Sequence, residues 1–210
     1  MSLCSSEALG RIEVELDDDS CEDSTLHVGT TDVRDCFYRL KWPAELAEYF
    51  CLASLSAAEV RAIRERSGRW FTDADDGPCE ARPVVDDSMH ACLGVAAMGC
   101  SWSLWMAQHV TSRRVAHLPC LAHRAAIADS GDACVIKASD RRPSHFVYVD
   151  NVGILGFWRQ SVALALEAAV GTLEDVGLAT HETQIHSGAA ELLGVELNCA
   201  LGCTRLTDKR

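Results

Sequence analysis

The stretch Phe146-Val147-Tyr148-Val149-Asp150-Asn151-Val152 decides the fold of this 210-residue chain. It lies between two β-prone runs, His145–Tyr148 and Val152–Phe157, with the turn residues Asp150 and Asn151 between them. This pattern predicts a β-hairpin. Because a hairpin tip extends beyond the edge of its sheet, we expect the sheet to present the Asp150 carboxylate at its edge.

The segments around this hairpin alternate between strands and helices. Leu26–Asp32 reads as a strand that ends in an acid, and Val33–Leu40 as a helical turn or short helix. Ser101–His117 has few helix breakers and predicts a helix. The clearest helix is Gln160–Val176, which Gly177 can end and whose apolar residues share one face: Val162, Leu166, Ala169, Val170, Leu173 and Val176. Such an order implies an α/β or α+β fold.

Composition and charge limit the class of protein. Apolar residues make up 48% of the chain and charged residues 24%, which excludes wholesale disorder. The net charge of −12 lacks the simple signature of a nucleic-acid binder. Eight acids against Arg11 alone fall within residues 1–25, which we expect to be a flexible acidic segment with an edge strand at Arg11–Leu16. One domain should follow, over residues 26–207.

The cysteines and the apolar runs bear on the cellular compartment. The chain has 11 cysteines, an odd number at irregular spacing and without a C-x-x-C pair, which favours reduced thiols. The N-terminus has neither the basic nor the apolar region of a signal peptide. No run of 18 apolar residues predicts a transmembrane helix. We therefore expect an intracellular protein without a membrane partner.

Three motifs follow one another along the chain: Asp32 with Phe37 five residues later, Ala96-Ala97-Met98-Gly99 before a predicted helix, and Tyr148-Val149-Asp150-Asn151 on the predicted hairpin. In this order they resemble the palm region of reverse transcriptases of the retrotransposon and retroviral type. That family has a strand-ending aspartate followed by an aromatic residue, a Leu-Pro-x-Gly turn before a long helix, and Tyr-x-Asp-Asp on a hairpin. The resemblance extends over residues 26–207 and includes a predicted strand at Leu192–Leu197.

The resemblance implies an RNA-directed DNA polymerase that uses two metal ions. Asp32, Asp150 and Asn151 would bind Mg²⁺, with Mn²⁺ as an alternative, and the two aspartates would be the catalytic residues. Phe37, Met98, Gly99 and Tyr148 would form the substrate-binding residues. Phe37 would exclude a 2′-hydroxyl, Gly99 would let the backbone approach the nucleotide or template, and Tyr148 would pack near the primer end.

The fold and partners implied by the resemblance follow from the same family. We expect an α+β domain, a palm-like antiparallel sheet of three or four strands with helices packed on one face. Leu26–Asp32 should lie beside the Tyr148 hairpin. The partners would be an RNA or DNA template-primer and deoxynucleotide triphosphates.

The chain also departs from the family pattern. Asn151 replaces a second aspartate and should weaken Mg²⁺ binding. The stretch Thr180–His186 has no lysine to protonate pyrophosphate, for which His181 or His186 would have to substitute. The separation of 118 positions from Asp32 to Asp150 suggests an insertion around residues 59–87. We expect the family's fingers, thumb or ribonuclease H portions to be missing from this chain. We expect this chain alone to be weakly active or inactive.

Two other functions stay open. The chain could be a non-catalytic retroelement relic that keeps the fold, or a small intracellular interaction or metal-binding module whose hairpin matches by chance. Trp102 and Trp105 share one face of the predicted helix, for which we expect a core position over base stacking. The doublet Arg113-Arg114 would be a solvated helix end or a contact to a template backbone.

Overall fold

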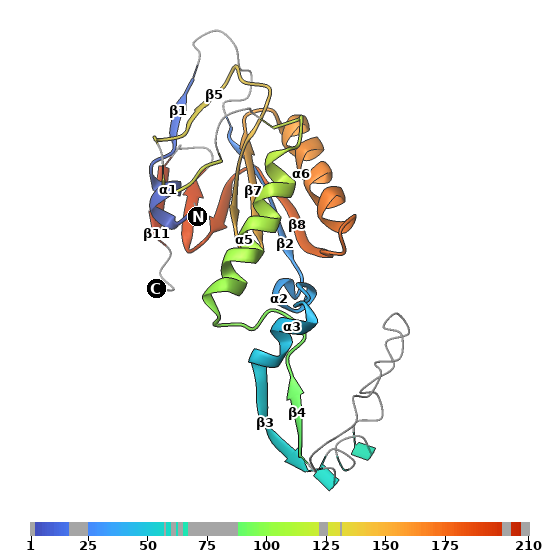
Figure 1. The fold of residues 1–210 in the computed structure, drawn as a ribbon. Helices are drawn as coiled ribbons and strands as arrows, with labels where there is room; N and C mark the ends of the chain where they lie inside the picture. The colour runs from blue at the N-terminus through green and yellow to red at the C-terminus, as the bar shows by residue number, and fades with distance from the viewer. Residues whose placement is uncertain are drawn as a thin grey trace. The chain divides into compact units, whose positions relative to one another are not determined.

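The computed structural model describes residues 3–16, 25–56, 58–59, 62, 65–66, 88–121, 126–130, 132–198 and 203–206. The chain divides into two compact units (Figure 1). The larger unit joins residues 1–39 to residues 98–210, and the smaller unit comprises residues 40–97.

The larger unit contains most of the helices and strands. Its helices are α1 (Ser6–Gly10), α2 (Cys36–Arg39), α5 (Ser101–Ala116) and α6 (Arg159–Glu174). Its strands are β1 (Glu13–Glu15), β2 (His27–Val33), β5 (Val135–Lys137), β6 (Ser144–Tyr148), β7 (Asn151–Gly156), β8 (Thr180–His186), β9 (Ala189–Leu192), β10 (Val195–Asn198) and β11 (Cys203–Leu206).

A four-stranded antiparallel sheet forms the centre of this unit, with strand order β6-β7-β2-β8. The β6–β7 hairpin pairs Tyr148 with Asn151, so its loop has two residues. Strand β2 pairs with β7 from His27 opposite Gly156 to Asp32 opposite Asn151. The predicted α+β class is confirmed, and the Leu26–Asp32 strand lies beside the Tyr148 hairpin as expected.

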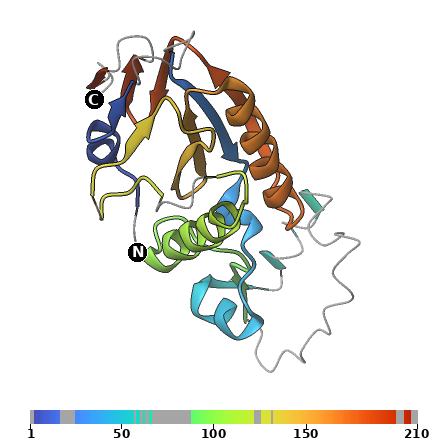
Figure 2. The ribbon, with the colours of Figure 1, turned by 90° about the horizontal axis from the view of Figure 1, so that it is seen from above.

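Helices α5 and α6 pack on one face of this sheet (Figure 2). Strand β2 packs closely against α6 at Gly29, where a Cβ would lie 3.1 Å from Val162 and 3.2 Å from Leu166 of the helix. Gly177, at φ +81°, follows α6, and the Leu178 N–H donates back to the carbonyl of Leu173. The predicted helix end at Gly177 is therefore confirmed.

The opposite face of the sheet is covered by the N-terminal and C-terminal elements (Figure 2). Val28, Phe146 and Leu155 of the sheet share a buried cluster with residues of α1, β5, β9 and β10, namely Ala8, Leu9, Ile136, Ala190, Leu192, Val195 and Leu197. The segment 1–25, expected to be a flexible acidic tail, is thus folded in part. The acidic composition suggests a solvated segment, but Ala8 and Leu9 of α1 are apolar and pack into the buried cluster. Residues 17–24 lie outside the described part of the chain.

A second hairpin replaces the single strand expected at Leu192–Leu197. Strand β9 ends at Leu192, Leu193 and Gly194 turn the chain, and β10 begins at Val195. Leu193 has φ +50° and Gly194 φ +76°. Two positive φ values in a two-residue loop are typical of a type I′ turn, which suits the twist of the strands it joins.

The smaller unit comprises α3 (Ala44–Ala47), the 3₁₀ helix η1 (Glu48–Phe50), β3 (Cys51–Ser56) and β4 (Ser88–Cys92). Trp42 stacks on Phe50 with ring centroids 5.1 Å apart. Strands β3 and β4 are antiparallel, and Ser56 pairs with Ser88. The Ser56–Glu59 capping box forms, with the Ser56 N–H donating to Glu59 Oε2 at 2.8 Å.

The insertion predicted around residues 59–87 lies almost entirely outside the described residues. The paired ends Ser56 and Ser88 bracket it. None of the helices in the described part of the chain is long and apolar enough to cross a membrane.

Candidate functional site

The end of β2 and the tip of the β6–β7 hairpin bring Asp32 and Asp150 together. Asp32 pairs with Asn151 across the two strands. The next residue, Val33, donates its N–H to the carbonyl of Asp150 at 3.0 Å. Both carboxylates therefore belong to the same end of the sheet, although they are 118 positions apart in the sequence.

The hairpin tip has an unfavourable backbone conformation. Val149, the first of its two loop residues, has φ +58° and is buried. A β-branched residue in the left-handed region is strained, and hairpin loops with this geometry usually have glycine there. Such a conformation persists only where its surroundings hold it.

Gln108 of α5 supplies that support. Its Nε2 donates to the carbonyl of Val147 at 3.0 Å, and its Oε1 accepts the N–H of Val149 at 2.6 Å. Gln108 is only 3% exposed, so water competes little for either bond. The helix thus fixes the loop that precedes Asp150.

The charges around Asp32 disfavour its ionised form. Partial burial raises the pKa of Asp32 above its usual range, and the nearby charges of Asp150 and Glu182 raise it further. The charge of His181 acts in the opposite direction. A carboxylate held against other carboxylates is a site where a cation would relieve repulsion.

His181 of β8 lies next to Asp32 on the other side of β2. The two residues pair across the strands, after a register shift between Thr30 and Asp32. His181 Nδ1 is 3.2 Å from the Asp32 carbonyl oxygen and 3.7 Å from Asp32 Oδ1. A carbonyl can only accept, so this nitrogen must carry the proton. His186 pairs with Val28 instead, toward the other end of β8.

A small acidic cavity of about 140 Å³ adjoins these groups. Asp32 and Asn151 contribute to it from the sheet, and Glu182 contributes from β8. Glu191, Leu192 and Leu193 line it from the β9–β10 hairpin. The cavity is therefore lined by three acidic residues, Asp32, Glu182 and Glu191, beside the apolar Leu192 and Leu193.

Asn151 and Cys36 lie close to the two aspartates and are further possible metal ligands. The Asn151 amide nitrogen donates to Asp150 Oδ1 at 2.9 Å, which holds the amide beside the carboxylate. Burial, followed by the charges of Asp150 and Asp32, raises the pKa of the Cys36 thiol to about 11. Cys36 therefore stays protonated at neutral pH and is a poor metal ligand. Apart from the imidazole of His181, the remaining donors beside Asp32 and Asp150 are oxygens.

These oxygen donors fit Mg²⁺ or Mn²⁺ better than a soft metal. Mg²⁺ binds through one or two carboxylates and keeps waters or substrate phosphates as its other ligands. Asp32 and Asp150 supply two carboxylates, with the amide oxygen of Asn151 as a neutral third donor. Within the described residues, no three His, Cys, Asp or Glu side chains form a metal-binding group by themselves. The protein ligands would thus be few, as Mg²⁺ sites allow.

The predicted substrate-binding residues lie at different depths. Phe37 of α2 is half-buried, just after the turn that follows Asp32, and Tyr148 at the end of β6 is 36% exposed. Met98 is exposed and accepts a hydrogen bond from Tyr38 Oη at 3.8 Å. Gly99 has φ +87° and would meet nothing within 4 Å if it carried a Cβ. Its backbone conformation, not crowding, requires glycine.

Sequence reasoning missed Gln108 and the exposure of the two tryptophans. A lone glutamine in a helix has no pattern that marks it as a hairpin support. Trp102 is 68% exposed and Trp105 is 41% exposed, so the expected core positions are wrong. Their i, i+3 spacing was compatible with either face of α5, and only the packing decides which face is buried.

No protein-family model matches the sequence, and no curated protein matches it.

Proposed function

We propose that the larger unit acts as the palm of an RNA-directed DNA polymerase, which transfers deoxynucleotides to a primer 3′-hydroxyl with two metal ions. The observation that carries the proposal is the pairing of Asp32 with the Asp150 hairpin at one end of an antiparallel sheet. The motif order in the sequence supports it independently, because three separate segments would have to match by chance.

Two bound Mg²⁺ ions would activate the primer hydroxyl and neutralise charge on the triphosphate. Asp32 and Asp150 would hold them, and the Asn151 amide would add a neutral oxygen. Gln108 would keep the hairpin loop rigid, so that the Asp150 carboxylate is positioned before substrate arrives. Such positioning before reaction is the main contribution a protein makes to phosphoryl transfer.

His181 would position Asp32 and moderate its charge. Its Nδ1–H donates to the Asp32 carbonyl, and a protonated imidazole would favour the ionised form of the Asp32 carboxylate. The same side chain is the best-placed candidate among the residues Thr180–His186 for donating a proton to the leaving pyrophosphate.

The surroundings of the site bear on how active the chain would be. Glu182 and Glu191 line the cavity beside Asp32, so a triphosphate without cations would meet only negative charge there. The neutral Asn151 side chain lacks the negative charge with which a second aspartate would help to bind a second metal ion. Both features support weak turnover by this chain alone, with Mn²⁺ more effective than Mg²⁺.

A non-catalytic relic is the second candidate, and one observation favours it. The Asn151 amide nitrogen donates to Asp150 Oδ1, so it occupies one lone pair that a metal ion would need. This hydrogen bond is what we expect of a chain that no longer binds metal ions and in which Asn151 has replaced the second aspartate of the family motif.

Primer extension by the purified chain tests the proposal. The substrate is a DNA primer on an RNA template, assayed in Mg²⁺ and separately in Mn²⁺. We compare Asp150→Ala with Asp140→Asn, which alters an exposed acid of the loop after β5. We expect incorporation that Asp150→Ala abolishes and Asp140→Asn retains.

Other outcomes contradict the proposal. Equal incorporation by Asp150→Ala and the unaltered chain would assign the activity to a contaminant. Absence of incorporation in either metal, from a sample with native circular dichroism, would leave the relic as the better description.

A further inference from the structure

A row of aromatic and cationic side chains runs along the solvent-facing side of α5. Trp102, Trp105, His109 and Arg113 follow one another at spacings of three and four residues, which places them on one face of the helix. The buried residues of α5 lie on the other side: Ser103, Ala107, Gln108, Thr111 and Val115. We call Trp102, Trp105, His109, Arg113 and Arg114 the α5 stripe.

The rings of the stripe contact one another and remain open to solvent. Trp105 stacks on His109, with ring centroids 5.0 Å apart and planes 6° apart. Trp102 meets Trp105 edge-on at 6.1 Å. Two tryptophans at 68% and 41% exposure make a large apolar surface for a helix that buries its opposite face.

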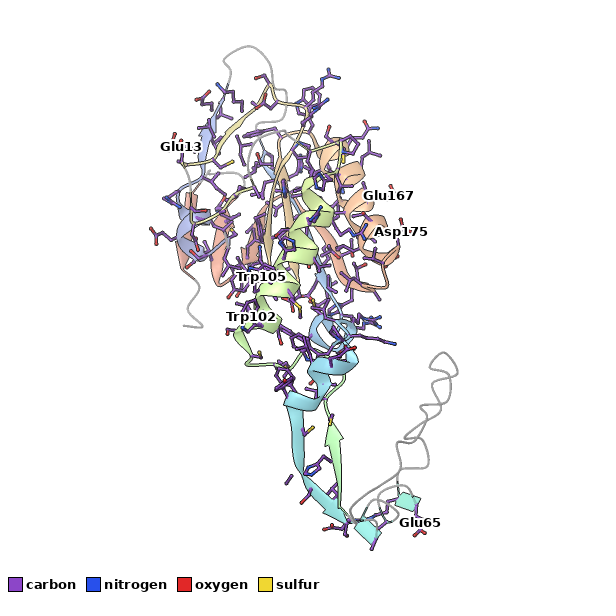
Figure 3. All side chains as sticks on the ribbon, in the orientation of Figure 1. Glu13, Glu65, Trp102, Trp105, Glu167 and Asp175 are labelled. Carbon is purple, nitrogen blue, oxygen red and sulfur yellow. The ribbon has the colours of Figure 1, made fainter. Side chains whose placement is uncertain are left out.

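The charge along the stripe is opposite in sign to that of the chain. Residues Ser101–Ala116 include two arginines and no acid, although the whole chain carries −12. A cavity of about 480 Å³ adjoins the stripe, lined by His109, Val110, Arg113, Arg114 and His117 of the α5 region and by Thr172 of α6. No carboxylate lines this cavity. In Figure 3, Glu167 and Asp175 lie along the outer edge of α6, away from the labelled Trp102 and Trp105.

We propose that the α5 stripe binds single-stranded nucleic acid. Bases would stack on the rings of Trp102, Trp105 and His109, and phosphates would lie against Arg113 and Arg114. Stacking surfaces next to a cationic groove are the two features by which proteins hold single strands without reading sequence. From Trp102 to Arg114 the helix rises about 18 Å, which spans about five nucleotides at the stacked spacing of DNA.

This inference does not depend on the proposed polymerase function. The stripe lies on the exposed side of α5, whereas Gln108 contacts the Asp150 hairpin from the buried side. Binding at the stripe needs no metal ion and no aspartate. A protein partner would be the other occupant of such an apolar surface, but the adjoining Arg113 and Arg114 favour a polyanion.

The test is fluorescence anisotropy with end-labelled 20-nucleotide uridine RNA, thymidine DNA and an abasic strand of equal length, all in EDTA. The aromatic variant is Trp102→Ala/Trp105→Ala, and its matched control is Tyr49→Ala, an aromatic residue that is 76% exposed in the smaller unit. The charge variant is Arg113→Glu, matched by Arg142→Glu, an exposed arginine outside α5.

We expect the tryptophan variant to bind the RNA and DNA strands about tenfold more weakly, or worse, with little change for the abasic strand. Arg113→Glu should weaken binding of all three strands and lower the slope of log affinity against log salt by about 0.7. Tyr49→Ala and Arg142→Glu should bind like the unaltered chain. If the unaltered chain binds the strands as expected here but shows no primer extension, the polymerase proposal fails and the binding inference stands.

The inference fails if the unaltered chain does not bind these strands, or if each variant loses as much affinity as its matched control. It also fails if sedimentation equilibrium finds self-association that the tryptophan variant abolishes, together with unchanged oligonucleotide affinity. That result would assign the stripe to contact between copies of the chain.

Discussion

The two hairpins of the larger unit solve the same geometric problem differently. The β6–β7 loop turns through Val149 and Asp150, and the β9–β10 loop turns through Leu193 and Gly194. Each has a non-glycine residue at positive φ, but only the second follows it with a glycine. The first loop relies on hydrogen bonds from Gln108 of a distant helix.

The difference shows that the conformation of a turn can be determined by its own residues or by contacts with a distant part of the chain. The β9–β10 loop has the glycine that its turn type favours at the second of its two loop positions. The β6–β7 loop contradicts local preference at Val149 and is imposed by packing. Departures from local rules concentrate at functional sites, and this loop carries Asp150.

Gly153→Ala should break the first hairpin with the largest effect. A Cβ there would lie 2.0 Å from the Phe146 ring, across the β6–β7 pair, and the ring is buried. We expect a loss of about 3 kcal/mol in the free energy of unfolding, measured by urea denaturation. Gly188→Ala, before β9, meets nothing within 4 Å and should be nearly neutral. If Gly153→Ala loses as little free energy of unfolding as Gly188→Ala, the Phe146 ring moves aside and the expectation is wrong.

Acid should destabilise the first hairpin through His145 of β6. Burial lowers the pKa of His145 to about 4, so the folded protein keeps it neutral while the unfolded chain binds a proton below about pH 6.5. Stability from this residue is therefore full above pH 6.5 and falls by about 3 kcal/mol as pH drops to 4.

Urea denaturation across this pH range measures the effect of His145. His145→Gln should flatten the profile, whereas the exposed His109→Gln should leave it unchanged. Parallel profiles for the unaltered chain and His145→Gln would contradict the assignment.

Gln108→Ala removes the support of the strained loop. It deletes two buried hydrogen bonds and leaves the Val149 N–H without its acceptor, which should cost about 2 kcal/mol. The melting temperature should fall by about 6 °C. Gln160→Ala, an exposed glutamine of α6, is the control. An unchanged melting temperature in Gln108→Ala would mean that the loop holds itself.

Gly194→Ala sharpens the comparison from the other side. Gly194 has φ +76°, where a Cβ is unfavourable, and the cost should be about 1 kcal/mol by thermal melting. Because Gln108 bonds to the loop of the other hairpin, the loss should not change in a Gln108→Ala background. If the loss in the double variant differs strongly from the sum of the two single losses, the two hairpins form one cooperative element, which would contradict this expectation.

Asp32→Asn should have the smallest effect and the opposite sign. The raised pKa means that the ionised form destabilises the folded state, and this penalty is complete above the folded pKa and absent below the unfolded one. At pH 7 in EDTA we expect the melting temperature to rise by about 2 °C. At pH 3 the two proteins should melt together. Lower stability of Asp32→Asn at pH 7 would mean that His181 outweighs the repulsion.

The elements with a strong local pattern were predictable from sequence. The Asp150 hairpin, the strand before Asp32 and the helix ended by Gly177 all appear within two residues of expectation. Strand β8 was not predicted, because Thr180–His186 is mostly polar and half-exposed, and only pairing with β2 makes it a strand. The β9–β10 turn was missed because Leu193 gives no turn signal.

The candidate site was predictable in part for the same reason. Asp32 and Asp150 end local elements, so their partnership follows from the pairing of two strands. His181 and Gln108 join them through a register shift and a helix packing angle, neither of which sequence spacing encodes.

The pairing of Ser56 with Ser88 has a consequence for how the chain can change over time. Whatever lies between them leaves and returns at neighbouring points of a two-stranded ladder. The entropy of closing such a loop grows only with the logarithm of its length. Residues can therefore be gained or lost between these two serines at a cost of a few tenths of a kcal/mol. The ladder makes this a position where the sequence can lengthen or shorten while the pairing of β3 with β4 is kept.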